Sequence, residues 1–220
     1  MTNKFYAVKK GFKPGIYNNW AACKKTVSGF SGAIFKSFKT KEEAQQFLNS
    51  TVKTTKDVAT VNLSIFNMLV YTDGGCRNHG NKLGESVKKT DKAAWAFLVT
   101  DNQNKKMFDG TDGKFGATNN QMELTAVIKA LRCLIDRNYN DKSIAFICDS
   151  RYVTDGINLR MNGYVEKEFV NLKNADLWRE LYLLLKEFNI KPQFYWTRGH
   201  STNKGNIYVD TLLNQTMNYM

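Results

Sequence analysis

MLVYTDGG, residues 68–75, joins a short apolar run to an acidic residue and two glycines. The apolar part, Met68–Thr72, has the length and composition of a buried strand. Asp73 follows it directly, so we expect the strand to end there with its carboxylate at the sheet edge. Asp149 stands in the same way after a second expected strand, Ser143–Cys148. Two such acids on adjacent strands would converge.

The chain around these strands alternates between the two kinds of element, which predicts a mixed sheet with helices on both faces. Apolar residues recur at helical spacing through Asn120–Asp136, the clearest helix. The other expected elements are strands at Ala93–Val99, Lys105–Thr111 and Gln193–Thr197, and helices at Arg151–Leu159, Asp176–Phe188 and Ile207–Asn218.

Residues 1–50 read as a separate small α/β unit. Its expected strands are Lys4–Lys9, Ile16–Asn19 and Ala33–Phe38. Asn19 is placed to cap a first helix, and Thr40–Glu43 forms a capping box for a second. Residues 51–66 lack a firm period and are expected to be a linker, so residues 67–220 form the larger domain.

The excess of basic over acidic residues indicates what kind of partner the protein binds. The 220 residues hold 32 Lys and Arg against 20 Asp and Glu, a net charge of +12, and residues 1–50 hold nine lysines against two acids. This excess favours a polyanion partner, with plain solubility as the alternative. The chain has no run of about 18 apolar residues, so no membrane span is predicted, and no signal peptide is recognisable. The four cysteines are scattered, which favours reduced thiols. We therefore expect a cytoplasmic protein, or one of another intracellular compartment such as the nucleus or an organelle.

Two further acids lie on helices. Glu123 falls one turn into its helix, and Asp210 lies near the start of the last one. Taken alone, an acid such as Asp149 is better explained as a helix cap or turn former. Four acids on four elements would repel one another unless divalent cations neutralised them, and all-oxygen ligands select Mg²⁺ or Mn²⁺. A pair of such ions suits phosphodiester cleavage, so the pattern indicates a nuclease.

Five short segments stand in an order and spacing that resembles type 1 ribonuclease H across about residues 67–217. They are TDGGC at 72–76, TNNQMEL at 118–124, CDSRYV at 148–153, NADLW at 174–178 and WTRGHSTNKGNIYVD at 196–210. The resemblance implies a ribonuclease H-like five-stranded mixed sheet with flanking helices, preceded by the small three-stranded α/β domain.

The same resemblance implies an endoribonuclease that hydrolyses the RNA strand of RNA–DNA hybrids by a two-metal-ion mechanism, leaving 5′-phosphate and 3′-hydroxyl ends. Two Mg²⁺ ions, with Mn²⁺ as a substitute, would be held by the catalytic acids, which are Asp73, Glu123, Asp149 and Asp210. His200 matches a family histidine that assists water activation or product release; a surface imidazole is the alternative.

Nucleic-acid contacts also follow from the resemblance. Asn119, Asn120 and Gln121 would face the minor groove. Thr118 and Asn174 match positions that hold a DNA-strand phosphate. Helix capping is the alternative for Thr118 and Asn119, and it is compatible with those roles.

The N-terminal unit resembles the hybrid-binding domain that precedes many enzymes of this family, through FYAV at 5–8, GIY at 15–17 and FKSF at 35–38. The matching Tyr6, Trp20, Phe35 and Lys36 would grip a duplex, with Trp20 and Phe35 as core residues in the alternative interpretation. The implied partners are an RNA–DNA hybrid and, through this domain, double-stranded RNA. A monomer without membrane association is expected.

Several features depart from the family pattern. Asn158–Lys173 is short and lacks the tryptophan of the usual basic protrusion, which predicts a weak grip by the catalytic domain alone. Ile207 replaces a usual glutamate, Val209 stands where a small residue is common, and a lysine-rich insertion occupies Asn81–Lys92. The competing functions are a non-catalytic duplex-binding module, an integrase-type DNA-cutting core and, less favoured by the length, a reverse transcriptase fragment.

Overall fold

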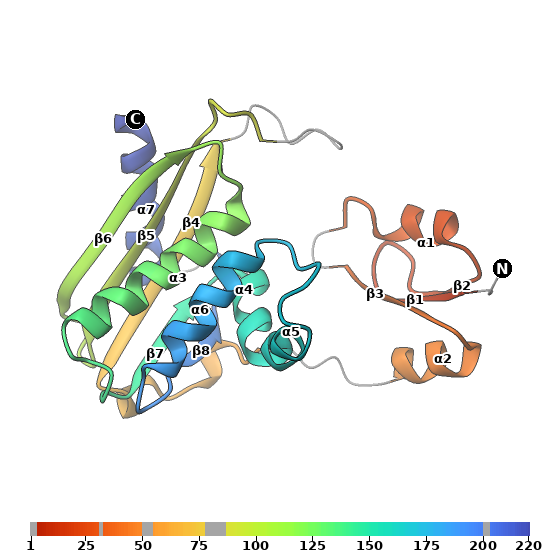
Figure 1. Ribbon diagram of the computed structural model, residues 1–220, viewed down its shortest axis with the longest axis horizontal. Helices are drawn as coiled ribbons and strands as arrows, with labels where there is room; N and C mark the ends of the chain where they lie inside the picture. Colours follow the sequence, from red (N-terminus) through yellow and green to blue (C-terminus); the bar gives the residue numbers. More distant parts are fainter. Residues whose placement is uncertain (1–3, 31–32, 50–54, 78–86, 200–202) are drawn as a thin grey trace. The chain divides into compact units, whose positions relative to one another are not determined.

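The computed structural model describes residues 4–30, 33–49, 55–77, 87–199 and 203–220. The chain divides into two compact units, Met1–Lys53 and Thr54–Met220 (Figure 1). None of the helices in the described ranges combines the length and apolar composition needed to cross a bilayer.

The first unit is a three-stranded antiparallel sheet with two helices. The central strand β1 (Phe5–Lys10) pairs with β2 (Gly15–Tyr17) and with β3 (Ile34–Phe38). The helices are α1 (Trp20–Val27) and α2 (Lys41–Asn49).

The helix caps expected in this unit are confirmed. The Asn19 side chain accepts a hydrogen bond from the backbone N–H of Ala22 at 2.8 Å. Thr40 and Glu43 exchange side-chain-to-backbone hydrogen bonds at 3.2 Å, as a capping box does. These short-range contacts fix where α1 and α2 begin.

The second unit contains the expected five-stranded mixed sheet, in the order β6-β5-β4-β7-β8. Strands β4, β5 and β6 are antiparallel, and β7 and β8 run parallel to β4. The strands are β4 (Met68–Arg77), β5 (Lys92–Asp101), β6 (Lys106–Phe115), β7 (Ile144–Cys148) and β8 (Gln193–Trp196).

Helices cover both faces of this sheet. Figure 1 shows α3 (Asn119–Asp136) and α6 (Ala175–Lys186) in front of it and α7 (Lys204–Tyr219) behind. Alternate residues of β4 enter the two cores: Val70 joins the one that contains Trp178, and Tyr71 joins the one formed with α7. Strand β4 is therefore buried on both sides.

Strand β4 does not end at Asp73, so the expected strand end was wrong. All residues from Met68 to Arg77 pair with β5, and this antiparallel ladder carries the strand past the acid. The parallel pairing with β7, in contrast, ends at Thr72 and Cys148. Asp73 is thus the first residue of β4 beyond its parallel neighbour.

Part of the expected linker belongs to the second unit. Residues 55–66 contain two short 3₁₀ turns, η1 (Val58–Thr60) and η2 (Leu63–Ile65). Val58 and Phe66 are buried in the core beneath α7, which explains why this stretch packs rather than remaining a tether.

The expected helix Arg151–Leu159 is interrupted. Helix α4 (Arg151–Asp155) gives way to a π-helical turn, η3 (Gly156–Arg160), and then to α5 (Met161–Glu166). At Gly156 a Cβ would lie 2.1 Å from the ring of Trp178, so the chain passes this ring at a distance that only glycine allows.

Replacing Gly74 tests the close contact between β4 and α3. A Cβ at residue 74 would lie 2.1 Å from the backbone nitrogen of Glu123. We expect Gly74→Ala to lower the free energy of unfolding by about 1–3 kcal/mol or more, because backbone must move to relieve the clash. Urea denaturation measures the change.

Gly163→Ala is the matched control, since nothing lies within 4 Å of its Cβ position in α5. It should leave stability unchanged or raise it by up to about 1 kcal/mol. Equal stability of Gly74→Ala and wild type would contradict the packing described.

Candidate active site

Three carboxylates from three elements meet at the edge of the sheet. Asp73 comes from β4, Glu123 from the second turn of α3, and Asp149 from the residue after β7. One oxygen of each lies within 4.8 Å of the others, and Asp73 and Glu123 are buried. The structure thus brings together three of the four acids expected from sequence.

Burial and mutual repulsion disturb the ionisation of this cluster. Burial, together with the charges of Asp149 and Asp210, raises the pKa of Asp73 to about 7, although the Gly74 N–H donates to its carboxylate. Burial, followed by the charges of Asp73 and Asp149, raises the pKa of Glu123 well above its usual value. Full ionisation at neutral pH therefore requires positive charge at the cluster.

Asp210 lies at the margin of the cluster. Among the described residues, the group whose oxygens lie within 4.8 Å comprises the other three acids. The charge of Asp210 nevertheless contributes to the raised pKa of Asp73. Helix α7 begins at Lys204, so Asp210 falls in its second turn. The Asn214 side chain donates to the Asp210 carboxylate at 3.1 Å, a partner that the sequence interpretation missed although residues i and i+4 share a helix face.

His200 and residues 81–86 of the lysine-rich insertion lie outside the described residues, so the expected role of His200 stays a prediction.

The residues expected to contact the minor groove surround the N-terminus of α3. The Thr118 hydroxyl accepts from the Gln121 backbone N–H at 3.3 Å, and the Gln121 side chain accepts from the Thr118 N–H at 2.8 Å. The capping alternative therefore holds for Thr118, and Gln121 is its partner. The Asn119 side-chain Nδ2 donates to Oε1 of Glu123 at 3.5 Å, so the segment adjoins the acidic cluster. Asn120 is half-buried.

Asn174 is fixed by a tyrosine that the sequence interpretation did not single out. It has φ of 60° at the start of α6, and its side-chain amide donates to the Tyr152 hydroxyl at 3.1 Å. The Trp178 indole donates to the same hydroxyl at 3.0 Å. Tyr152 thus joins α4 to α6 through contacts that no local sequence signal shows.

Aromatic residues gather on one face of the N-terminal unit. The ring centroids of Tyr6 and Trp20 lie 5.7 Å apart, as do those of Trp20 and Phe35. Trp20 is 43% exposed and Phe35 42%, so the core alternative for these two is wrong. Lys36 follows Phe35 in the strand and lies over Phe38, on the opposite face.

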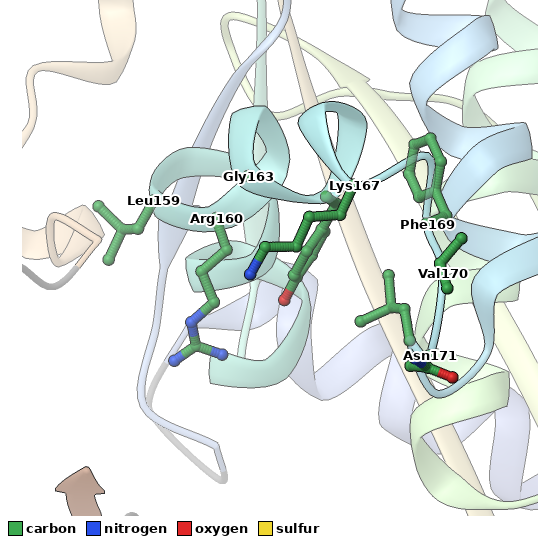
Figure 2. Close-up of a pocket in the computed structure, with 9 residues that line it drawn as sticks. Leu159, Arg160, Gly163, Lys167, Phe169, Val170 and Asn171 are labelled. Carbon is green, nitrogen blue, oxygen red and sulfur yellow. The ribbon is translucent and has the colours of Figure 1, made fainter. Parts of the chain in front are cut away.

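The short segment 158–173 lines a cavity of about 590 Å³. Figure 2 shows Arg160 and Lys167 extending into a hollow, with Val170 and Asn171 across from them. Its basic side chains are thus few and face a partly apolar surface.

Two known protein families match the two units separately. Residues 66–218 match the family model for RNase H, and residues 4–48 match the ribonuclease H1 N-terminal domain. The chain belongs to the ribonuclease H family. It is 35% identical over 155 residues to a Ribonuclease H of Ruthia magnifica subsp. Calyptogena magnifica, covering 68% of this chain and 94% of the relative. A Ribonuclease H of Chromohalobacter salexigens is 34% identical, over 66% of this chain and 80% of the relative.

Solved structures support the same fold. LC9-RNase H1, a type 1 enzyme with the type 2 active-site motif, aligns with a TM-score of 0.57 at 21% identity, covering 77% of this chain and 75% of the other. LC11-RNase H1 in complex with an RNA/DNA hybrid aligns with a TM-score of 0.52 at 17% identity, covering 69% and 97%. The expected family and fold are both confirmed for this ribonuclease H.

The raised pKa values predict how the stability of the metal-free enzyme varies with pH. Between the ordinary pKa of an aspartate, about 4, and the folded value of about 7 for Asp73, the folded state binds more protons than the unfolded state. Stability should therefore fall as pH rises through this window, by about 1.4 kcal/mol for each unit by which the pKa is raised.

Urea denaturation in a chelator at about pH 5 and about pH 8 measures this loss. Asp73→Asn should reduce it, because the variant removes one titrating group. A metal-free wild-type protein that is equally stable at both pH values would show that the pKa values of these carboxylates are not raised as described.

Proposed function

We propose that this ribonuclease H hydrolyses the RNA strand of RNA–DNA hybrids at the acidic cluster, leaving 5′-phosphate and 3′-hydroxyl ends. The observation that carries the proposal is the convergence of three carboxylates within 4.8 Å at the sheet edge. A purely structural cluster of this kind would keep its mutual repulsion without any gain.

The donor set fits a hard divalent cation. Ribonuclease H enzymes are metal-dependent, and every side chain in the cluster offers carboxylate oxygen. Oxygen ligands favour Mg²⁺, with Mn²⁺ as a substitute, over Zn²⁺. We assign two ions to the site, held by Asp73, Glu123, Asp149 and Asp210. When bound, such ions activate water and stabilise the leaving oxygen of a phosphodiester.

The protein's own groups prepare the reaction. Asp73 and Glu123 are held by the packing of β4 against α3, and Asp149 by the end of β7, so their geometry is set before substrate arrives. His200 assists water activation or product release as a proton carrier. Thr118 and Asn174 hold a DNA-strand phosphate, while Asn119, Asn120 and Gln121 face the minor groove.

We assign residues 1–50 to hybrid binding and residues 67–220 to catalysis. In the N-terminal unit, Tyr6, Trp20 and Phe35 offer an exposed aromatic surface against the sugars, and Lys36, which projects from the opposite face of β3, contacts phosphate. Double-stranded RNA is a second ligand of this unit. Because segment 158–173 carries few basic residues, tethering to this unit supplies much of the effective concentration of substrate.

The nuclease proposal predicts cleavage of a labelled RNA–DNA hybrid in Mg²⁺, and no cleavage of a DNA duplex. Asp73→Asn should lower the rate by at least about 10³-fold, because it removes a carboxylate at the centre of the cluster. Gel analysis of end-labelled substrates measures both.

Asp112→Asn, which removes an exposed acid on β6, is the control and should retain wild-type activity. Hybrid binding without turnover by wild type would favour the non-catalytic module. Cleavage of the DNA duplex would favour the integrase-type alternative.

The aromatic surface predicts a separable loss of affinity. Trp20→Ala with Phe35→Ala should weaken hybrid binding roughly tenfold or more, because stacking surface is lost, yet leave kcat at saturating hybrid unchanged. Fluorescence anisotropy at several salt concentrations and steady-state kinetics measure the two effects.

Phe12→Ala removes another exposed aromatic of the same unit, which packs on Phe30 instead, and should bind hybrid as wild type does. If both variants bound equally well, the aromatic surface would have no special role.

A further inference from the structure

A chain of side-chain contacts connects the end of β4 to the fourth acid. The Arg77 guanidinium donates to the Asn214 carbonyl oxygen at 3.0 Å and to its side-chain Oδ1 at 3.2 Å. It also donates to the Asn218 side chain at 2.6 Å. Asn214 in turn donates its Nδ2 to the Asp210 carboxylate at 3.1 Å and to the Asp210 carbonyl oxygen at 2.9 Å.

The arginine determines which way the Asn214 amide points. A guanidinium has only donors, so it requires the amide oxygen of Asn214 to face it. The amide NH₂ must then face the opposite direction, toward Asp210. A carboxylate accepts hydrogen bonds from this group, whereas a flipped amide would present its oxygen and repel the carboxylate.

The same contacts relate Asp210 to Asp73. Arg77 and Asp73 belong to one continuous strand, β4, whose residues all pair with β5 through Arg77. Asp210 lies on a different element, α7, outside the close group of three acids. The side chains of Arg77 and Asn214 therefore hold Asp210 in a fixed position relative to β4, the strand that carries Asp73.

Other polar contacts fasten α7 without reaching Asp210. The Thr111 and Thr216 hydroxyls lie 2.8 Å apart between β6 and α7, and Lys106 donates to the Tyr208 hydroxyl at 2.7 Å. Docking of the helix thus does not depend on Arg77 and Asn214 alone, which makes their additional contact with the carboxylate informative.

We propose that Asn214 and Arg77 are positioning residues for metal binding: Asn214 holds the Asp210 carboxylate in place, and Arg77 acts through Asn214 by fixing its amide. This inference rests on the proposed function, because it takes Asp210 as a metal ligand. Side chains that orient metal ligands commonly change metal affinity by about 10–100-fold when removed.

Titration of the free, full-length protein with Mg²⁺ by calorimetry tests the proposal without substrate. Asn214→Leu should weaken Mg²⁺ binding roughly tenfold and raise the Mg²⁺ concentration for half-maximal cleavage by a similar factor. Hybrid binding in a chelator should not change. Arg77→Met should show a smaller loss in the same direction, which Arg77→Lys partly restores.

The double variant separates action through Asn214 from an independent effect. If Arg77 acts through Asn214, Asn214→Leu with Arg77→Met should bind Mg²⁺ no worse than Asn214→Leu alone. Thr216→Val is the matched control, since it removes another contact of α7 and does not touch Asp210. It should leave Mg²⁺ affinity unchanged, even where thermal denaturation shows a similar loss of stability.

Unchanged Mg²⁺ affinity in Asn214→Leu, or an equal loss of affinity in Thr216→Val, would overturn the positioning role. The proposed function would still stand if the wild-type protein cleaves hybrid. Additive losses in the double variant would overturn the action of Arg77 through Asn214. A wild-type protein that neither binds Mg²⁺ nor cleaves hybrid would overturn both proposals.

Discussion

Repulsion between closely spaced carboxylates is the constraint around which the larger unit is built. Asp73, Glu123 and Asp149 would separate if their backbones were free, yet one oxygen of each lies within 4.8 Å of the others. They are held by well-packed elements: β4 lies in the centre of the sheet, and α3 contributes much of the largest core. The free energy of that packing opposes the repulsion, which a bound cation relieves.

The sheet's mixed topology explains why the acids meet where they do. The parallel pairing of β4 with β7 stops at Thr72, while the antiparallel pairing with β5 continues to Arg77. Asp73 is consequently paired with β5 on one side and lies beyond the ladder with β7 on the other. The same extension carries Arg77 to the surface of α7, where it meets Asn214. One strand thereby supports both the centre of the site and its margin.

The two units present different surfaces. The catalytic unit has a segment with few cations at 158–173, arranged around a partly apolar hollow. The N-terminal unit presents the exposed rings of Trp20 and Phe35 on one face and Lys36 on the other, because neighbouring strand residues such as Phe35 and Lys36 project oppositely. A small domain that leaves Trp20 exposed gives up part of the core that this side chain would otherwise fill.

Local features of the chain were predictable from sequence, because they depend on residues close together in it. The capping side chains Asn19 and Thr40, the apolar stripe of α3 and the order of the acidic motifs all act over a few positions. The order of the acidic motifs predicted the family and the five-stranded sheet, which are confirmed, and it singled out four acids, three of which the structure brings together.

Tertiary structure alone decided the features that depend on distant partners. Asp73 lies within a strand because β5 pairs beyond it, residues 55–66 pack because a core lies beneath α7, and Tyr152 meets Asn174 across two helices. Asp210 stands apart from the other acids and is held by Asn214, which Arg77 orients from a strand 137 positions away. Sequence patterns carry no distances between such residues, whereas the packing of the sheet and its helices fixes them.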